Sequence, residues 1–159
     1  STNSIYTRFG DKSGLFSAVV KPAADGLMEI YLGSISEASV RGSANTAIDM
    51  GGDGTEQVLK YIYDNLDAFR LIFCNSAGTE YEDYFDRLAE TEEKFYRDFV
   101  RKYAKEPQKI SDFFIHVVCR TGWQYVFEVV SHDIPYEEAQ GFMKSIREYS
   151  FAGWKRVME

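Results

Sequence analysis

The chain of 159 residues is 45% apolar, 16% aromatic and 27% charged, with 3 Pro, 12 Gly and 2 Cys. This length and composition predict a folded domain with at most a small appendage, and they exclude disordered and low-complexity proteins. No apolar stretch approaches the ~18 residues that a transmembrane helix needs, so we expect no membrane span. Two cysteines and an N-terminus without an apolar leader predict a reducing, cytoplasmic location.

The net charge of −7 is unevenly distributed along the chain. Residues 1–21 contain three basic side chains and one acidic side chain, so this segment carries +2 and the remainder carries −9. Nucleic-acid affinity depends on neutralising phosphates, and an acidic body does not supply that attraction. Any contact with DNA is therefore expected within the first twenty residues.

Apolar residues recur at helical spacing through almost the whole chain and predict an all-α fold. The first long helix is predicted from Asp11 to about Ile35, and Pro22 is expected to kink it or split it. Residues 33–54 contain five glycines among Ser, Asn and Asp, which predicts a long loop or a frayed segment. A second helical run follows over residues 55–73, and Asn65 is the point at which it is expected to divide.

Three further helical runs complete the prediction. The third covers residues 81–103 and ends before Pro107, with the carboxylates of residues 80–93 expected on a solvated face. The fourth covers residues 113–130; two β-rich stretches in it resemble strands, but the unbroken length favours a helix buried on two sides. The last helix begins at Pro135 and runs to the C-terminus.

No arrangement of residues typical of an enzyme is found, and we expect neither catalysis nor a cofactor. His116 and Cys119 lie three positions apart, so a helix would place them on one face. Two ligands do not make a metal site, and a single histidine in an apolar helix is more often a core residue. We therefore predict no metal site.

The first sixteen residues read Ser-Thr-Asn-Ser-Ile-Tyr-Thr-Arg-Phe-Gly-Asp-Lys-Ser-Gly-Leu-Phe. This segment resembles the end of the helix-turn-helix in the TetR/AcrR family of transcriptional regulators, where the pattern is Ser-x-x-Thr-Leu-Tyr-x-x-Phe-x-Ser-Lys-x-x-Leu. The positions in register are Ser1, Ser4, Ile5, Tyr6, Phe9, Asp11, Lys12 and Leu15. The rest of the chain matches the family in helix order and length.

The resemblance implies two domains. Residues 1–20 would be the C-terminal part of a helix-turn-helix DNA-binding domain, and residues 21–159 a helical effector-binding and dimerisation domain. Two helices precede the recognition helix in the family, whereas this chain begins at the recognition helix. We therefore expect a copy that is truncated or partly disordered within the helix-turn-helix and that binds DNA weakly or not at all, because an isolated helix of about two turns is marginal in water.

Five polar or aromatic side chains are candidates for DNA contact under this resemblance. Thr2 and Asn3 lie at the exposed start of the recognition helix, where side chains reach base edges. Tyr6, Thr7 and Lys12 are candidates for phosphate contacts. Ile5, Phe9 and Leu15 are expected in the core. The alternative is an ordinary polar helix start without a role in DNA binding.

A ligand pocket is expected between the second, third and fourth helical runs. The fourth helix is apolar on two faces, and a short chain can hardly bury both internally. A few polar side chains in an apolar wall are typical of a site for a small, mostly apolar effector. The predicted walls are Tyr61, Phe73, His116, Arg120 and Trp123. For each of them, a plain core or rim position is the alternative.

A homodimer is expected to form through the last two helices as a four-helix bundle. The final helix carries a stripe of large apolar residues with one glycine, which a monomer would expose as a contiguous patch. The stripe comprises Phe142, Ile146, Tyr149, Gly153 and Trp154. The alternative is that the stripe is buried within its own subunit.

Together these patterns predict a ligand-responsive DNA-binding transcriptional regulator. It would be a repressor that a small-molecule effector releases from its double-stranded operator. The alternative is a helical ligand-binding or scaffold protein with no DNA role.

Overall fold

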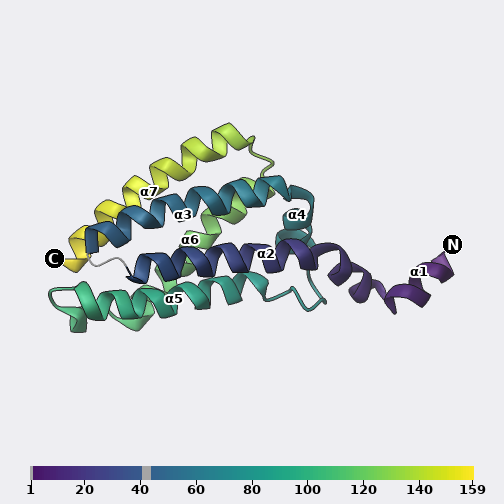
Figure 1. Ribbon diagram of the computed structural model, residues 1–159, viewed down its shortest axis with the longest axis horizontal. Coiled ribbons are helices and arrows are strands. Elements are labelled where there is room, and N and C mark those ends of the chain that lie inside the picture. The colour runs from purple at the N-terminus through teal and green to yellow at the C-terminus, as the bar shows by residue number, and fades with distance from the viewer. Residues whose placement is uncertain (1, 41–43) are drawn as a thin grey trace.

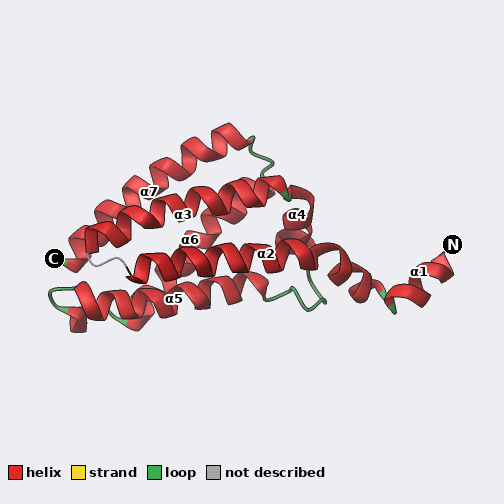
Figure 2. Cartoon of the chain, viewed as in Figure 1, coloured by secondary structure: helices red, strands yellow, loops and turns green. Residues whose placement is uncertain are grey.

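The computed structural model describes the backbone of residues 2–40 and 44–159 and the side chains of residues 2–37 and 54–159. Within these ranges the chain is all-α, with seven α-helices, one short 3-10 helix and no strand (Figure 2). The predicted all-α class is confirmed, as is the helical state of residues 113–130. The elements are α1 (Thr2–Phe9), α2 (Lys12–Val40), α3 (Ala44–Asp64), α4 (Leu66–Asn75), α5 (Tyr84–Tyr103), η1 (Pro107–Lys109), α6 (Asp112–Ser131) and α7 (Tyr136–Met158).

The helices form an elongated body with one projecting arm (Figure 1). In the body, α2 packs against α3, α4 and α5, while α6 packs against α4 and α5. The last helix, α7, packs mainly on α3. The arm consists of α1 and the first turns of α2, and it points away from the body. One helix, α2, therefore belongs to both parts.

Several helix ends lie where the local sequence predicts them. Gly10 has a φ of +78°, a left-handed conformation that glycine adopts without strain, and it separates α1 from α2. Asp11 begins the next helix, because its Oδ1 accepts a hydrogen bond of 2.8 Å from the Gly14 amide. Ser111 caps α6 in the same way, because its Oγ accepts a hydrogen bond of 3.1 Å from the Phe114 amide. Asn65 divides α3 from α4 as predicted.

The prediction of a long loop over residues 33–54 is wrong for the backbone that the structure describes, and its residues 41–43 lie outside the described residues. The backbone of α2 is helical as far as Val40 and α3 begins at Ala44. Glycine costs a helix only about 1 kcal/mol per residue, which tertiary packing outweighs. Gly54 illustrates this, since a Cβ there would lie 3.0 Å from the Ser34 Cβ and would press α3 away from α2. Pro22 does not split α2 either, because the helix continues through it.

The buried apolar side chains form two clusters. The larger one joins all the helices of the body and includes Leu27, Ile62, Phe69, Leu88 and Val130, each fully buried. The smaller one lies where the end of α5, the start of α6 and the end of α7 meet. Its members are Phe99, Val100, Ile110, Ile115, Cys119, Trp154 and Met158.

No helix in the described part of the chain is both long enough and apolar enough to cross a bilayer.

Candidate functional site

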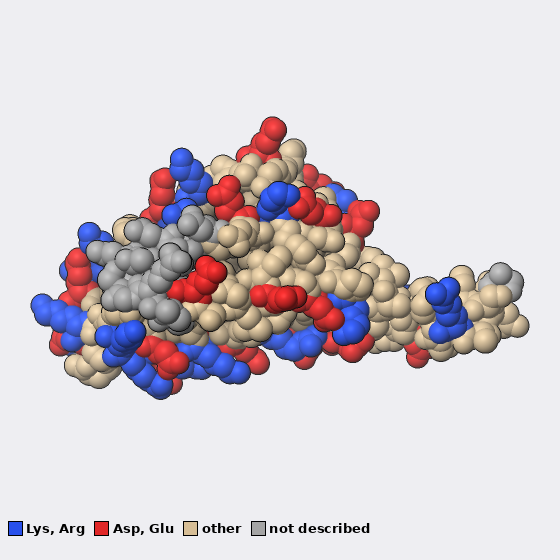
Figure 3. Space-filling model, viewed as in Figure 1, with Lys and Arg blue, Asp and Glu red and all other residues tan. Residues whose placement is uncertain are grey.

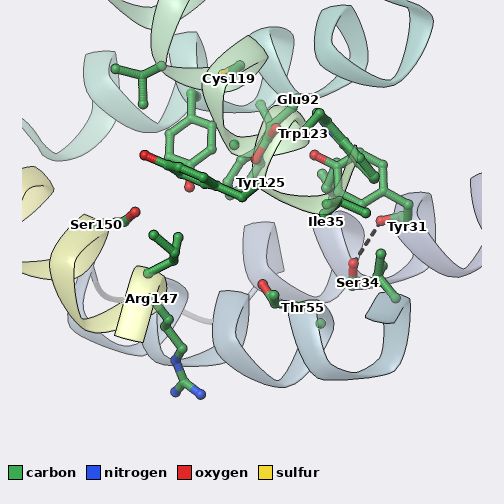
Figure 4. A pocket seen from close by; sticks show the side chains of 18 of the residues that line it. Tyr31, Ser34, Ile35, Thr55, Glu92, Cys119, Trp123, Tyr125, Arg147 and Ser150 are labelled. Carbon is green, nitrogen blue, oxygen red and sulfur yellow. Dashed lines mark hydrogen bonds between the residues drawn. The ribbon is translucent and has the colours of Figure 1, made fainter. Parts of the chain in front are cut away.

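A cavity of about 220 Å³ lies between the two core clusters, where α7 faces α2, α5 and α6. Figure 4 shows side chains from these helices and from α3 around it. Its walls are Tyr31, Ser34, Ile35, Gly54, Thr55, Val58, Glu92, Phe95, Tyr96, Phe99, Val118, Cys119, Gly122, Trp123, Tyr125, Val126, Met143, Ile146, Arg147, Ser150, Phe151 and Trp154. A concave, mostly apolar site with a few polar groups is typical of small-molecule binding.

One carboxyl group, that of Glu92, faces this cavity from α5. The fully buried Leu88 precedes it by one helical turn, and Phe95, Tyr96 and Phe99 follow it on the same side of the helix. Glu92 therefore occupies a position that belongs by spacing to the apolar stripe of α5. Packing of that stripe against the body carries the carboxyl group into the interior.

Burial raises the pKa of Glu92 from its ordinary value to about 8, because an apolar environment disfavours the charged form. The Trp123 indole N–H and the Tyr31 hydroxyl lie near the carboxyl group and partly offset this rise. The Trp123 Nε1–H itself is buried and finds no acceptor at hydrogen-bonding geometry among the described residues. The site thus holds a carboxyl group that is mostly uncharged at pH 7, and the Trp123 N–H beside it makes no hydrogen bond to a described residue.

The remaining polar groups of the cavity are neutral or directed elsewhere. Burial is the main reason that the pKa values of the Tyr31 and Tyr96 hydroxyls and of the Cys119 thiol lie above their ordinary values, so all three are protonated near neutral pH. Ser34 Oγ donates a hydrogen bond of 2.8 Å to the Tyr31 carbonyl oxygen (Figure 4). The Arg147 side chain extends away from Glu92.

Of the five residues predicted as pocket walls, only Trp123 lines this cavity. His116 and Arg120 lie instead along the contact between α5 and α6. His116 Nδ1 is 2.7 Å from Glu93 Oε1, and an Arg120 guanidinium nitrogen is 2.5 Å from Asp86 Oδ1. They lie about a third of a turn around α6 from the middle of the residues that face the cavity, at 3.6 residues per turn.

Tyr61 and Phe73 are also absent from the cavity walls. The Tyr61 hydroxyl donates to the Pro22 carbonyl oxygen at 3.4 Å, which ties α3 to α2. Phe73 packs in an aromatic group with Phe69, Phe85 and Phe127, at centroid distances of 5.7, 6.3 and 6.4 Å. Both are structural residues of the body.

The expectation of a solvated carboxylate face over residues 80–93 fails at its end. Glu93 is only 5% exposed and is held by His116 and by Arg97, whose guanidinium nitrogen is 2.9 Å from Glu93 Oε2. Glu92 lines the cavity. The signal for Glu92 was present in the sequence, since it fills the gap between Leu88 and Phe95 in a stripe spaced by three and four.

The predicted dimer stripe of α7 is divided in the structure. Ile146 and Trp154 face the cavity, and Trp154 is only 7% exposed. Phe142 and Tyr149 are 39% and 71% exposed, and Gly153 is also exposed. Trp154 is therefore a core residue of its own subunit, and the outward part of the stripe is smaller than predicted.

The five predicted DNA-contacting residues lie together on the arm. Thr2, Asn3, Tyr6 and Thr7 belong to α1, and Lys12 is the first residue of α2; all five are exposed. Ile5, expected in the core, is 46% exposed, because no helix other than α2 lies beside α1. On the face shown in Figure 3, most charged side chains lie on the body and few on the arm.

The described residues contain no group of three or more His, Cys, Asp or Glu side chains placed to hold a metal ion. His116 is engaged by Glu93, and Cys119 is 2% exposed at the edge of the cavity. Cys74 is exposed.

Comparisons with protein-family models, curated proteins and solved structures gave no match to this chain.

Proposed function

We propose that this chain is the effector-binding part of a ligand-responsive DNA-binding transcriptional regulator, acting as a repressor. The observation that best supports this proposal is that one continuous helix, α2, connects the arm with the cavity. Lys12 at its start lies beside α1, and Tyr31, Ser34 and Ile35 in its second half line the cavity. The resemblance of residues 1–16 to a recognition helix and the start of the next helix supplies the DNA-binding role.

The proposed mechanism is a shift of α2 between two positions. A ligand that fills the cavity presses on Tyr31 and Ile35, and a helix transmits such a displacement along its axis to α1. The ligand shifts the equilibrium only by its difference in affinity for the two positions. In a homodimer, the distance between two α1 helices would change and the operator would be released.

Exposed apolar side chains on the last two helices support the homodimer. Phe113 and Val117 on α6 are 73% and 44% exposed, and Tyr149 on α7 is 71% exposed. Exposed large apolar side chains are typical of an interaction surface where they lie together. Pairing of α6 and α7 with their copies would give a two-fold four-helix bundle and would present two arms to DNA.

The second candidate is a helical ligand-binding or scaffold protein without a DNA role. The observation in its favour is that α1 buries no side chain and that the body is acidic. The cavity serves equally well in such a protein.

DNA binding separates the two candidates. The experiment compares this chain with a version that carries two supporting helices before residue 1, in a gel shift against DNA upstream of the gene. We expect weak binding by this chain and specific binding by the longer version. Lys12→Ala in the longer version should weaken binding and lower the salt slope by about one, as loss of one phosphate contact does.

The matched control is Lys60→Ala, since Lys60 lies on α3 in an ion pair with Asp64, away from the arm. It should leave DNA affinity unchanged. Absence of specific binding by a folded longer version would favour the scaffold or ligand-binding alternative, and tight specific binding by this chain alone would contradict the dependence on supporting helices.

A further inference from the structure

We infer that the cavity selects a small organic cation, an ammonium group carried on an apolar frame, with the Glu92 carboxylate as its counter-ion. This inference rests on the proposed function only in treating the cavity as an effector site, and it does not depend on DNA binding. Its basis is the lone carboxyl group, the charges around it and the aromatic walls.

The charges of the cavity walls are the first observation. Glu92 and Arg147 are the two charged residues among the described side chains that line it. Arg147 is exposed and extends away from the glutamate, so it does not neutralise the carboxyl group (Figure 4). An anionic ligand would meet this carboxyl group without compensation, whereas a cation would supply the missing charge.

The neighbours of Glu92 on each packed helix are the second observation. They are Tyr31 from α2, Tyr96 from α5 itself, and Cys119 and Trp123 from α6. No basic group belongs to this described set. Its neighbour Glu93, which is buried, contrasts with the half-buried Glu92, because the Glu93 carboxylate is held by both Arg97 and His116. A carboxylate removed from water is normally paired, and no basic side chain in the described part of the chain pairs with Glu92.

The third observation is the number of aromatic rings around the same space. A cation is attracted to the face of an aromatic ring, most strongly to tryptophan, and the attraction strengthens where water is excluded. Aromatic walls of this kind also pack against the apolar frame of a ligand. The rings that line the cavity are Tyr31, Phe95, Tyr96, Phe99, Trp123, Tyr125, Phe151 and Trp154.

Cation binding also gives the unsatisfied donor of the site a partner. The Trp123 Nε1–H is buried and has no acceptor at hydrogen-bonding geometry within the described side chains, and Trp123 is 4% exposed. A cation that holds Glu92 ionised turns its carboxyl group into a full acceptor for both the Trp123 N–H and the Tyr31 O–H. Charge-assisted hydrogen bonds of this type are stronger than those to a neutral carboxyl group.

Binding is therefore coupled to loss of one proton. Since burial raises the pKa of Glu92 to about 8, the carboxyl group is mostly neutral at pH 7 in the absence of a cation. A permanent cation binds the ionised form, so its affinity rises roughly tenfold per pH unit well below pH 8 and levels off above it. A neutral ligand has no such dependence.

The test uses three probes of similar size. They are phenyltrimethylammonium, its neutral isostere tert-butylbenzene, and benzoate. Isothermal titration at pH 6.5, 7.5 and 9, in buffers of different ionisation enthalpy, measures affinity and the number of protons released. We expect the cation to bind best at pH 9, to release about one proton at pH 6.5 by the same linkage, and to exceed both other probes in affinity.

Glu92→Gln should reduce cation affinity at pH 9 at least tenfold and abolish proton release, while tert-butylbenzene binding remains. The matched control is Glu90→Gln, on the exposed face of the same helix, which should change neither. Proton release by the unmodified protein tests the inference even if Glu92→Gln folds poorly.

Two results would overturn the inference while leaving the cavity as an effector site. One is tighter binding of tert-butylbenzene or benzoate than of the cation at pH 9, and the other is unchanged cation affinity in Glu92→Gln. Failure of all three probes to bind would count against both the inference and the effector role of the cavity. Cation binding without operator binding would support the inference and contradict the regulator.

Discussion

The indole ring of Trp154 stacks on the phenol ring of Tyr96, with centroids 4.7 Å apart and an interplanar angle of 11°. This contact joins the end of α7 to α5 at the edge of the cavity. A second ring, that of Phe114 on α6, meets the same indole edge-on at 5.8 Å. Trp154 thus connects three helices around the candidate site. The sequence pattern alone had assigned this tryptophan to a subunit interface.

Trp154→Ala should lower the free energy of unfolding by about 3–5 kcal/mol, the usual cost of removing a large buried aromatic side chain. Urea denaturation measures this change. Glu148→Ala on the same helix is the control, since Glu148 is exposed and lies outside the apolar stripe, and it should change stability by at most about 0.5 kcal/mol. A Trp154→Ala protein of unchanged stability that no longer self-associates would restore the interface assignment.

Tyr149→Glu should convert the proposed homodimer into a monomer without loss of subunit stability. Tyr149 lies on the outward part of α7, where a charge would be buried without a partner in the dimer. Analytical ultracentrifugation at micromolar concentration measures the oligomeric state. Lys94→Glu, at an exposed position of α5, is the control and should remain dimeric. A monomeric unmodified protein would contradict the homodimer itself.

Glu92 should make the protein less stable as the pH rises. Because burial raises its pKa to about 8 in the folded chain, the folded state holds a proton that the unfolded chain, with a carboxyl pKa near 4.5, has already lost. Stability therefore falls between about pH 4.5 and pH 8 and changes no further from this group above that range.

Glu92→Gln should remove this contribution. The variant should match the unmodified protein near pH 4 and exceed it at pH 9 by several kcal/mol, because each unit by which burial raises the pKa of Glu92 corresponds to about 1.4 kcal/mol of stability. Denaturant melts across this pH range measure the difference. An equal pH dependence in both proteins would show that the carboxyl group is solvated in the folded state.

Two glycines of α2 should respond in opposite directions to the same substitution. An alanine methyl group at Gly26 would overlap the Tyr61 hydroxyl and displace its contact with Pro22, so Gly26→Ala should cost about 1–3 kcal/mol. Gly33 has nothing within 4 Å of the added carbon, so Gly33→Ala should stabilise the helix by about 0.5–1 kcal/mol. Thermal unfolding compares them, and destabilisation by both would contradict the packing described for α2.

The sequence by itself determined the helices and most of their ends. The spacing of apolar residues, prolines and capping residues act on the backbone within a few positions. Helix boundaries therefore lie at the same residues whatever the surrounding fold is, as they do at Gly10, Asp11, Asn65 and Ser111. The loop predicted for residues 33–54 failed because glycine propensity is a weak preference that contact between α2 and α3 overrides.

Only the tertiary structure decided which face of each helix meets which neighbour. The sequence places His116, Arg120 and Trp123 close together on α6, but α5 takes the first two into ion pairs and leaves Trp123 to the cavity. Likewise, the spacing of α7 assigns Trp154 and Tyr149 to one stripe, and the packing buries the first and exposes the second. Helical periodicity indicates that one face of a helix is apolar. Which neighbouring helix covers that face depends on the relative rotation and position of whole helices. Long-range packing sets that arrangement, and it is also what turned Glu92 from a surface carboxylate into the one acidic wall of the described cavity.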